Sequence, residues 1–421
     1  MKTSFQLETH PHPTGHRVRA LLRIEGEAPS DDARIPINLA FVLDRSGSMG
    51  GGKLEAVKRA ARDLILRLHP DDQVSVVAFD DEVRTVARSG SAAEQPGLLR
   101  DLMSIQAGGC TNLSGGWLQG RALVQERLRS EGVNRVILLT DGLANAGITD
   151  RTTLRQLCSD ALSARVSTTT VGVGGGYDED LLGDLAEAGG GFTYYIERLD
   201  QTGSIFEEEL EGLLSIAAQN LTVRIRPQGG ASLITVHHTY PSVAEADDVL
   251  ALSLGDLYAR EPGELLVDFI VPESPEIGEG APVAIAEVTV EADAWAADGS
   301  LARKVIRLPV VFDPAAGAVS HPEVTRVFTL LEAARVRREA IERGDRGDAG
   351  GAADLLHEMA LALDDSAVDD PSVVAEARDL HQMARTLREQ EAMMESDRKY
   401  LYAKERAYSR NRRGAGDRLD R

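Results

Sequence analysis

Cysteine is scarce in this sequence. Only two of the 421 residues are cysteines, Cys110 and Cys158. A disulfide framework in so long a chain would need more of them, and disulfides persist mainly in oxidising compartments. The scarcity favours a reducing compartment, and we predict that the protein is cytoplasmic.

Long apolar runs are missing as well. No stretch approaches the ~18 apolar residues that a membrane-spanning helix needs. The opening "MKTSFQLETHPHPTGH" lacks the apolar centre of a secretory signal. These two absences predict a protein with neither a membrane span nor a secretory leader.

Positive charge is in short supply too. The chain has 46 lysines and arginines against 67 aspartates and glutamates, which gives a formal net charge of −21 at pH 7. Such a surface repels nucleic acid and anionic membranes, and it is compatible with cationic partners or divalent ions. We therefore expect no nucleic-acid partner.

A regular alternation of strand and helix patterns runs from residue 35 to 219. The continuous apolar run "PINLAFVLD" is typical of a strand buried on both faces, and "KLEAVKRAARDLILRL" after it has apolar residues at helical spacing. The same pairing recurs as far as "DEDLLGDLAEAGG". This order predicts a Rossmann-like, doubly wound α/β domain over residues 35–219, with a mostly parallel sheet.

The pattern changes on both sides of this domain. Residues 220–313 hold short alternating runs separated by Pro, Gly and Asp, which are typical of an antiparallel β-sandwich. Residues 1–34 contain two more strand-like runs, and two strands do not form a stable fold alone. We predict that residues 1–34 complete the sandwich, so that the α/β domain is inserted in it. A C-terminal helical region follows over residues 314–421.

One turn of the α/β domain has two interpretations. In "FVLDRSGSMGGGKLEAV", Gly47 to Lys53 spells GxxxxGK, close to a phosphate-binding P-loop. A P-loop has Ser or Thr after its lysine to bind Mg²⁺, and this chain has Leu54 there. The alternative function is therefore a nucleotide hydrolase that uses the Gly47–Lys53 turn, or a metal-dependent hydrolase that uses the Asp-rich rim beside it.

The same turn offers oxygen ligands for a divalent cation. Asp44 ends the first strand, and Ser46 and Ser48 follow in the turn. Two further segments are expected at this edge of the sheet: "GGCTNLSGG", with Thr111, and "LLTDG", with Asp141 at the end of a central strand. Five oxygen-bearing side chains from three loops suit octahedral Mg²⁺ or Mn²⁺.

These five residues, in this order, resemble the metal-ion-dependent adhesion site (MIDAS) of von Willebrand factor A domains. The resemblance implies a cation held mainly by Ser46, Ser48 and Thr111, with Asp44 and Asp141 acting directly or through water. Ca²⁺ is a further candidate ion. An A domain inserted in a β-sandwich is similar to the arrangement in integrin β-subunits and in bacterial relatives of the inter-alpha-trypsin inhibitor heavy chains. Relatives of this kind often act beside AAA+ ATPases of the MoxR type, which are candidate partners.

The ligand set predicts binding rather than turnover. Two carboxylates and three neutral hydroxyls leave the ion electrophilic at an open position, for which an Asp or Glu of a partner protein is the natural ligand. No GxSxG, HExxH or paired-carboxylate motif occurs, and the loops offer no general base beyond the ligands. We predict a metal-dependent protein-binding adaptor or scaffold that is not an enzyme.

Three other groups of residues are weaker candidates. Cys110 has no histidine in sequence reach to activate it, which predicts a buried, inert thiol. Asp80 and Asp81 in "AFDDEV" are expected to be hairpin-turn residues. The histidines of "THPHPTGH", His10, His12 and His16, are expected in an exposed turn between strands.

Overall fold

The structure is a computed structural model. It describes residues 1–27, 35–196, 198–259, 261–273, 281–295, 300–366, 368 and 370–409. These residues form two compact units: an α/β unit within residues 28–219 and 294–302, and a sandwich-helix unit within residues 1–27, 220–293 and 303–421. The domain junction expected after residue 34 and the expected helical residues 410–421 fall outside the described residues.

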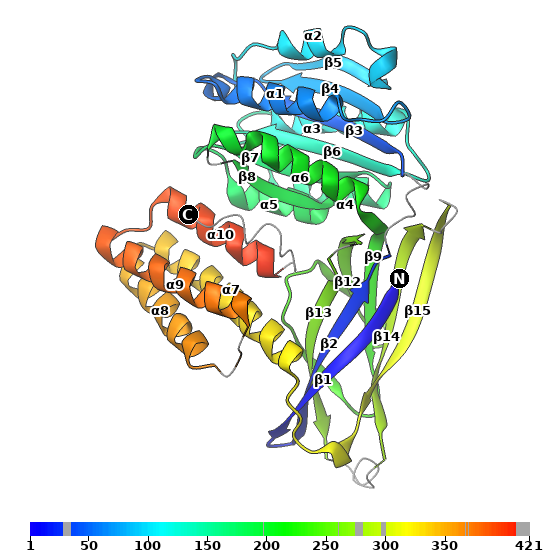
Figure 1. Cartoon of the computed structure of the whole chain (residues 1–421), viewed down its shortest axis with the longest axis vertical. Helices are drawn as coiled ribbons and strands as arrows, with labels where there is room; N and C mark the ends of the chain where they lie inside the picture. The colour runs from blue at the N-terminus through cyan, green and yellow to red at the C-terminus, as the bar shows by residue number, and fades with distance from the viewer. Residues whose placement is uncertain are drawn as a thin grey trace. The chain divides into compact units, whose positions relative to one another are not determined.

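A six-stranded sheet forms the middle of the α/β unit (Figure 1). Its order is β5-β4-β3-β6-β7-β8, and the pairs are parallel except for β4 with β5, which form an antiparallel hairpin. All residues of β3, β6 and β7 are buried, as expected for strands that are covered on both faces. The strands are β3 (Ile37–Asp44), β4 (Gln73–Phe79), β5 (Val83–Gly90), β6 (Val133–Thr140), β7 (Ser167–Val173) and β8 (Gly190–Ile196).

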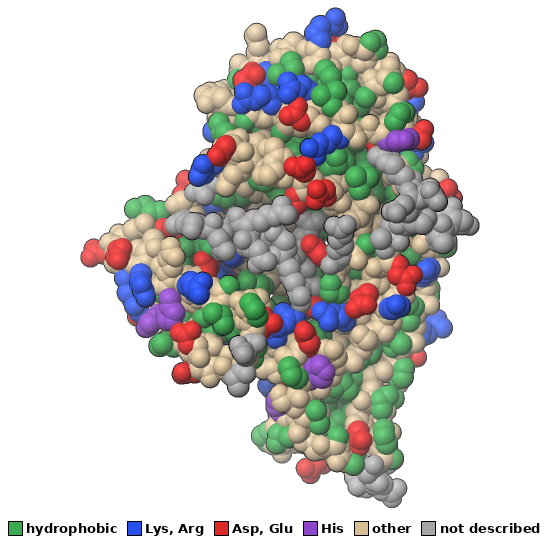
Figure 2. Space-filling view, viewed as in Figure 1, with side chains coloured by type: hydrophobic (Ala, Val, Ile, Leu, Met, Phe, Trp, Pro, Cys, Tyr) green, Lys and Arg blue, Asp and Glu red, His purple; other side chains and the backbone are tan. Residues whose placement is uncertain are grey.

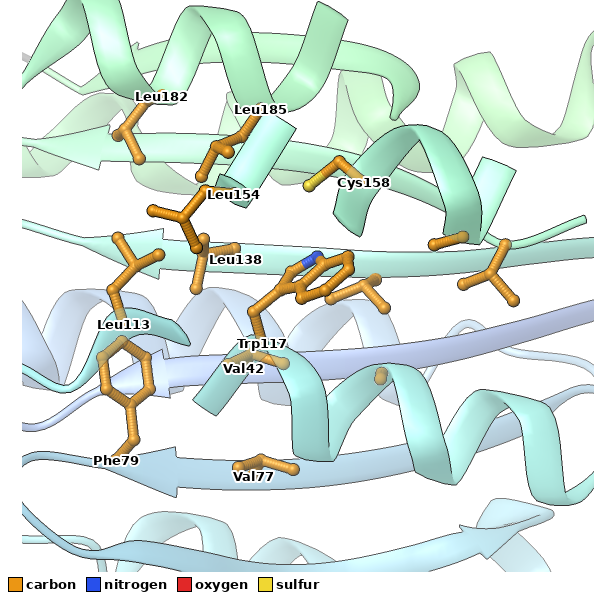
Figure 3. Close-up of a cluster of buried hydrophobic side chains, with 14 of the residues drawn as sticks. Val42, Val77, Phe79, Leu113, Trp117, Leu138, Leu154, Cys158, Leu182 and Leu185 are labelled. Carbon is orange, nitrogen blue, oxygen red and sulfur yellow. The ribbon is translucent and has the colours of Figure 1, made fainter. Parts of the chain in front are cut away.

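Helices cover both faces of this sheet. Val42 of β3 lies in a buried cluster with Trp117 of α3 and Leu154 of α4 (Figure 3). Phe41, the preceding residue, stacks on Phe206 of α6 with the ring centroids 6.1 Å apart. Because side chains alternate along a strand, α3 and α6 lie on opposite faces. The α-helices are α1 (Lys53–Ile65), α2 (Leu98–Met103), α3 (Leu113–Glu126), α4 (Arg151–Ser163), α5 (Glu179–Ala188) and α6 (Thr202–Leu214).

Two antiparallel sheets form the sandwich of the other unit (Figure 1). One has the order β1-β2-β13-β10 and the other β11-β12-β9-β14-β15. Gly263 of the first sheet faces Leu221 and Leu257 of the second. The strands are β1 (Lys2–His12), β2 (Gly15–Glu25), β9 (Ile216–Pro227), β10 (Ser232–Val236), β11 (Ser242–Ala244), β12 (Leu250–Tyr258), β13 (Gly263–Pro272), β14 (Val283–Trp295) and β15 (Leu301–Phe312).

The N-terminal strands complete this sandwich. β2 pairs with β1 on one side and with β13 on the other, and both pairings are antiparallel. The α/β unit is therefore inserted between two parts of one sheet, since β2 precedes it in the chain and β13 follows it. The predicted fold class, a Rossmann-like α/β domain inserted in an antiparallel sandwich and followed by helices, is confirmed.

Four α-helices follow the sandwich in the described part of the chain: α7 (Pro322–Asp345), α8 (Ala349–Asp364), α9 (Pro371–Gln390) and α10 (Glu395–Ser409). The first half of α7 packs on the sheet, where Val324 and Val327 meet Leu21 and Leu266. Its later residues join a second buried cluster with α8, α9 and α10. α7 thus connects the sandwich to a helical array in the same unit.

None of the described helices is both long and apolar enough to cross a membrane. Acidic and basic side chains are interspersed over the face displayed in Figure 2. Among the described residues on this face, the acidic side chains are not gathered in a single area.

Candidate metal centre

The predicted site residues lie at the carboxyl edge of the central sheet. Asp44 is the last residue of β3, and Asp141 follows directly after Thr140, the last residue of β6. β3 and β6 are parallel neighbours. The chain passes from β3 to β4 on one side and later enters β6 on the other, so the strand order reverses here. Ligands of open α/β sheets bind at such a reversal, beyond the carboxyl ends of the strands.

Asp44 is a buried carboxylate with two hydrogen-bond donors. Its Oδ1 accepts a hydrogen bond from the Ser46 backbone N–H over 2.8 Å, and its Oδ2 accepts one from the Thr140 hydroxyl over 2.5 Å. Burial nevertheless raises the pKa of the Asp44 carboxyl, Asp141 adds a smaller effect of the same sign, and the hydrogen bonds oppose both. A cation beside Asp44 would offset the cost of keeping it charged.

The two serines extend the cluster to Asp141. Ser46 directly precedes the short 3-10 helix Gly47–Met49, and Ser48 lies within it. Their Oγ atoms are 3.1 Å apart, and the Ser48 hydroxyl donates a hydrogen bond to Asp141 Oδ1 over 2.7 Å. Hydrogen-bond contacts of 3.1 Å or less therefore link four of the five predicted residues in series: Asp44, Ser46, Ser48 and Asp141.

Thr111 reaches the same place from the loop before α3. A Cβ added at Gly142 would stand 3.1 Å from Thr111 Oγ1, 3.8 Å from Ser48 Oγ and 3.9 Å from Asp44 Oδ2. The three side-chain oxygens thus lie around one point, and the glycine keeps a side chain of its own out of it. The Thr111 carbonyl also accepts hydrogen bonds from the N–H groups of Asn145 and Ala146, at 3.1 and 3.2 Å. These bonds tie the Thr111 loop to the loop after β6.

The structure therefore brings all five predicted residues together, and their chemistry fits a hard divalent cation. Two buried carboxylates would supply charge to such an ion, and three hydroxyls would supply neutral oxygen ligands. Among the described residues, no group of three or more His, Cys, Asp or Glu side chains could hold a metal ion. A metal ion bound here would therefore need the hydroxyls of Ser46, Ser48 and Thr111 as ligands in addition to the two carboxylates.

Lys53 has a partner in this cluster that the sequence patterns do not reveal. Its Nζ donates to Asp141 Oδ2 over 2.6 Å and to the Ser48 carbonyl over 3.3 Å. The Asp141 side chain is fully buried, whereas that of Lys53 is 28% exposed. The lysine of the GxxxxGK pattern is thus an ion-pair partner inside the candidate centre.

Asp80 does more than turn the β4–β5 hairpin. Its buried carboxylate pairs with Arg45 at 2.8 Å and accepts the Glu82 N–H at 2.8 Å. Its carbonyl accepts the N–H of Asn112, the neighbour of Thr111, over 2.8 Å. The hairpin turn therefore holds both the loop after Asp44 and the loop that carries Thr111.

The prediction that Cys110 is buried is wrong. Its side chain is exposed, and its backbone N–H donates to Asp81 Oδ1 over 3.2 Å. Cys110 precedes α3 in a loop beyond the strand ends, so that it lies outside the core although Thr111 beside it is buried. Cys158 of α4 is the buried thiol, and burial raises its pKa to about 12.

The prediction of an exposed turn for the N-terminal histidines is wrong in part: His10 and His12 lie on β1 and His16 on β2, beside the turn, and all three are half-buried. They belong to the β1–β2 hairpin, in which Pro11 pairs with His16 and His12 with Gly15. His12 Nδ1 is 3.0 Å from the Thr14 hydroxyl. The histidine-rich stretch is therefore the end of the β1–β2 hairpin.

Comparison with known proteins defines the class of the α/β unit. Residues 38–208 match the von Willebrand factor type A domain family. This part of the chain is a von Willebrand factor type A domain, with the strand order and the site position described above.

Curated relatives match parts of this chain. An uncharacterized protein of Synechocystis is 30% identical over 260 residues, which cover 61% of this chain and 60% of that protein. The Escherichia coli protein YfbK is 26% identical over 226 residues, or 53% of this chain and 39% of that one. The human inter-alpha-trypsin inhibitor heavy chain H4 is 32% identical over 172 residues, or 39% and 18%. The chain thus matches less than two thirds of the length of each.

Solved structures share the fold over nearly the whole chain. A von Willebrand factor type A protein of Catenulispora acidiphila superposes with a TM-score of 0.67, at 17% identity, over 91% of this chain and 96% of that one. The ArnB paralog VWA2 of Sulfolobus acidocaldarius gives 0.57, at 16% identity, over 99% and 98%. The fold of this chain is therefore shared by these two proteins over nearly their whole length.

Proposed function

We propose that this protein is a divalent-metal-dependent adaptor or scaffold that binds an acidic residue of a partner protein through a MIDAS. The observation that carries the proposal is a cluster of five residues: oxygens of Asp44, Ser48 and Thr111 lie around one point beside Gly142, and hydrogen-bond contacts link Ser46 and Asp141 to Asp44 and Ser48. The von Willebrand factor type A family of this domain supports it, because the five residues are those that resemble the adhesion site.

Each residue has a role in this proposal. Ser46, Ser48 and Thr111 supply hydroxyl oxygens to the ion, and Asp44 and Asp141 hold it directly or through water. Mg²⁺ and Mn²⁺ suit these hard ligands best, and Ca²⁺ is the third candidate. The bound ion supplies a Lewis-acidic position that accepts a carboxylate from the partner.

The charge of the protein favours this mode of recognition. With a net charge of −21, the surface as a whole repels an acidic partner. A dication offsets the two aspartates and makes one small region attractive to a carboxylate. Attachment through the ion is therefore specific for that region and depends on the ion.

The contacts within the cluster favour binding over catalysis. The side chains that hydrogen-bond there are hydroxyls, carboxylates and one lysine. Hydrolysis would need a general base directed at a water molecule, and both aspartates are already hydrogen-bonded to residues of the cluster. The hydrolase alternative makes a distinct prediction, namely nucleotide hydrolysis that Lys53→Ala abolishes.

A capture experiment tests the proposal and identifies the partner. Full-length protein is immobilised in Mg²⁺, in EDTA, and as the double variant Ser46→Ala with Ser48→Ala in Mg²⁺, and a lysate of the source organism is passed over each. We expect acidic partners that only the wild type in Mg²⁺ retains. An AAA+ ATPase of the MoxR type is one partner to look for. Retention of the same proteins on all three supports would overturn the proposal.

A further inference from the structure

Lys53 engages Asp141, one of the two buried carboxylates of the candidate centre. Its Nζ is 2.6 Å from Asp141 Oδ2, while Asp141 Oδ1 accepts the Ser48 hydroxyl over 2.7 Å. Both oxygens of Asp141 are thus engaged by residues of the turn that also supplies the predicted ligands Ser46 and Ser48. An ion that binds beside Asp141 meets an ammonium already in contact with it.

The backbone holds Lys53 in this position. Lys53 is the first residue of α1, and Gly52 before it adopts a left-handed conformation with φ of 99°. On the other side, a Cβ added at Gly174 would stand 3.1 Å from Lys53 Cε and 3.4 Å from its Nζ. The lysine chain therefore passes closely over a glycine of the loop after β7, where a side chain would obstruct it.

The charges of the cluster make this contact important. Asp44 and Asp141 are both buried, and two uncompensated buried carboxylates are strongly unfavourable. Lys53 compensates one of them. A dication compensates both, but it then stands near an ammonium of like sign, and the repulsion weakens its binding.

We propose that Lys53 is a tethered counter-cation of the metal centre. Its ammonium and the divalent ion compete for Asp141, so that Lys53 stabilises the cluster without an ion and lowers its affinity for one. This inference rests on the proposed function, because it assumes that the five residues bind a metal. It concerns Asp141 and Lys53 alone, and it gives the cluster a means to exist stably with and without its ion.

The test compares Lys53→Met with Arg67→Met in the full chain. Methionine is an unbranched side chain one atom shorter than lysine, and it removes the charge. Arg67 lies just beyond the other end of α1 in an exposed pair with Glu207, so Arg67→Met makes the same change in net charge away from the site. Mn²⁺ affinity is measured by isothermal titration calorimetry, and thermal unfolding is measured in EDTA and in excess Mg²⁺.

We expect Lys53→Met to bind Mn²⁺ about tenfold more tightly than the wild type, and to unfold at a lower temperature in EDTA. Mg²⁺ should restore its unfolding temperature. Arg67→Met should match the wild type within about twofold in affinity. If Lys53→Met does not fold in EDTA, Lys53→Gln, which keeps a hydrogen-bond donor, allows the affinity to be measured.

The outcomes separate this inference from the proposed function. Equal or weaker Mn²⁺ binding by Lys53→Met, when the wild type binds Mn²⁺ through Ser46 and Ser48, overturns the counter-cation alone. Weaker binding would mean that Lys53 orients Asp141 as a ligand. Absence of Mn²⁺ binding by the wild type and by both Lys53 variants overturns the metal centre and this inference together.

Discussion

Gly142 leaves space beside the oxygens of the candidate centre. Three oxygens of the cluster lie within 4 Å of the place where its Cβ would stand. Gly142→Val would fill that place, and we expect Mn²⁺ affinity to fall by tenfold or more, that is by at least ~1.4 kcal/mol. Calorimetric titration of the full chain measures this loss.

Gly108→Ala is the matched control for this substitution. Gly108 lies in the loop that leads to Thr111, and a Cβ added there would meet nothing within 4 Å. Its N–H, which donates to the Arg45 carbonyl, is kept in alanine. Equal loss of affinity in both variants would mean that general disturbance of the loops, and not the filled space, is responsible.

The two cysteines should differ in reactivity. Cys110 is exposed, whereas burial raises the pKa of Cys158 to about 12. A thiol with a raised pKa stays protonated at pH 8, and the thiolate is the reactive form. A thiol-reactive dye at pH 8 should therefore label one cysteine in the native protein and two after denaturation.

Cys110→Ser identifies the reactive residue. It should abolish native labelling and leave one cysteine that reacts only after denaturation. Rapid native labelling of Cys110→Ser would contradict the buried environment of Cys158.

The sequence alone was enough to predict the residues whose side-chain oxygens are suited to a divalent cation. Asp44, Ser46 and Ser48 stand together in one turn, and Thr111 and Asp141 follow strand and loop patterns that bring them to the same edge. The contacts of Lys53 with Asp141 and of Asp80 with Arg45 could not be predicted, because they depend on which strands are neighbours and on how the loops between them turn. Cys110 shows the reverse error, since a loop beyond the sheet can expose one residue and bury the next.

At the scale of elements, a buried ionic network joins three of the last four helices. Arg337 of α7 has no exposed surface; its Nε donates to Glu376 over 2.9 Å and its Nη2 to Asp379 over 2.6 Å, both on α9. The Tyr400 hydroxyl of α10 donates to the other oxygen of Asp379. Burial, with Asp379 adding to it, raises the pKa of Tyr400, so the hydroxyl stays a donor.

Removal of Arg337 should therefore destabilise the helical array strongly. Arg337→Met leaves Glu376 buried without its partner, and we expect a loss of about 3–5 kcal/mol in unfolding free energy. Arg335→Met on the same helix removes an arginine that is 56% exposed and should cost less than ~1 kcal/mol. Differential scanning calorimetry measures both, and similar midpoints for the two variants would contradict the network's importance.

The helices themselves could be predicted from apolar spacing, but the break between α9 and α10 could not. α9 ends at Gln390, and Glu391 adopts a left-handed conformation with φ of 54° before α10 begins at Glu395. Glutamate is a good helix former, and neither Gly nor Pro marks this turn. Packing of α10 against α7, with Tyr400 and Leu401 in the common core, accounts for the reversal.

At the scale of the whole molecule, the α/β unit contains the complete candidate centre. The five predicted residues, Lys53, Thr140 and Gly142 all lie between residues 35 and 219, and this segment has its own buried cluster. A fragment of residues 35–219 should therefore fold and bind Mn²⁺ within about threefold of the full chain. Circular dichroism and calorimetric titration check the two claims, and a folded fragment without affinity would show that the site needs the rest of the protein.

The insertion could be predicted because two N-terminal strands need partners and only the later β segments offer them. Which of these later strands pairs with β2 could not be predicted. Several later strands have the same alternating pattern, and nothing in that pattern selects β13 for β2. The buried pair of Arg19 with Asp268, at 2.9 Å, is one contact that fixes this choice.

That pairing has a consequence for the order of synthesis. Arg19 and Asp268 are 249 residues apart in the chain. A ribosome adds roughly 5–20 residues per second, so the edge of β2 emerges on the order of 10–50 s before its partner strand exists. During that time the nascent α/β domain can complete its own fold. The edge of β2 that later pairs with β13 stays unpaired and can aggregate with other strands. A chaperone that shields this edge would therefore raise the yield of full-length protein more than that of the fragment 35–219.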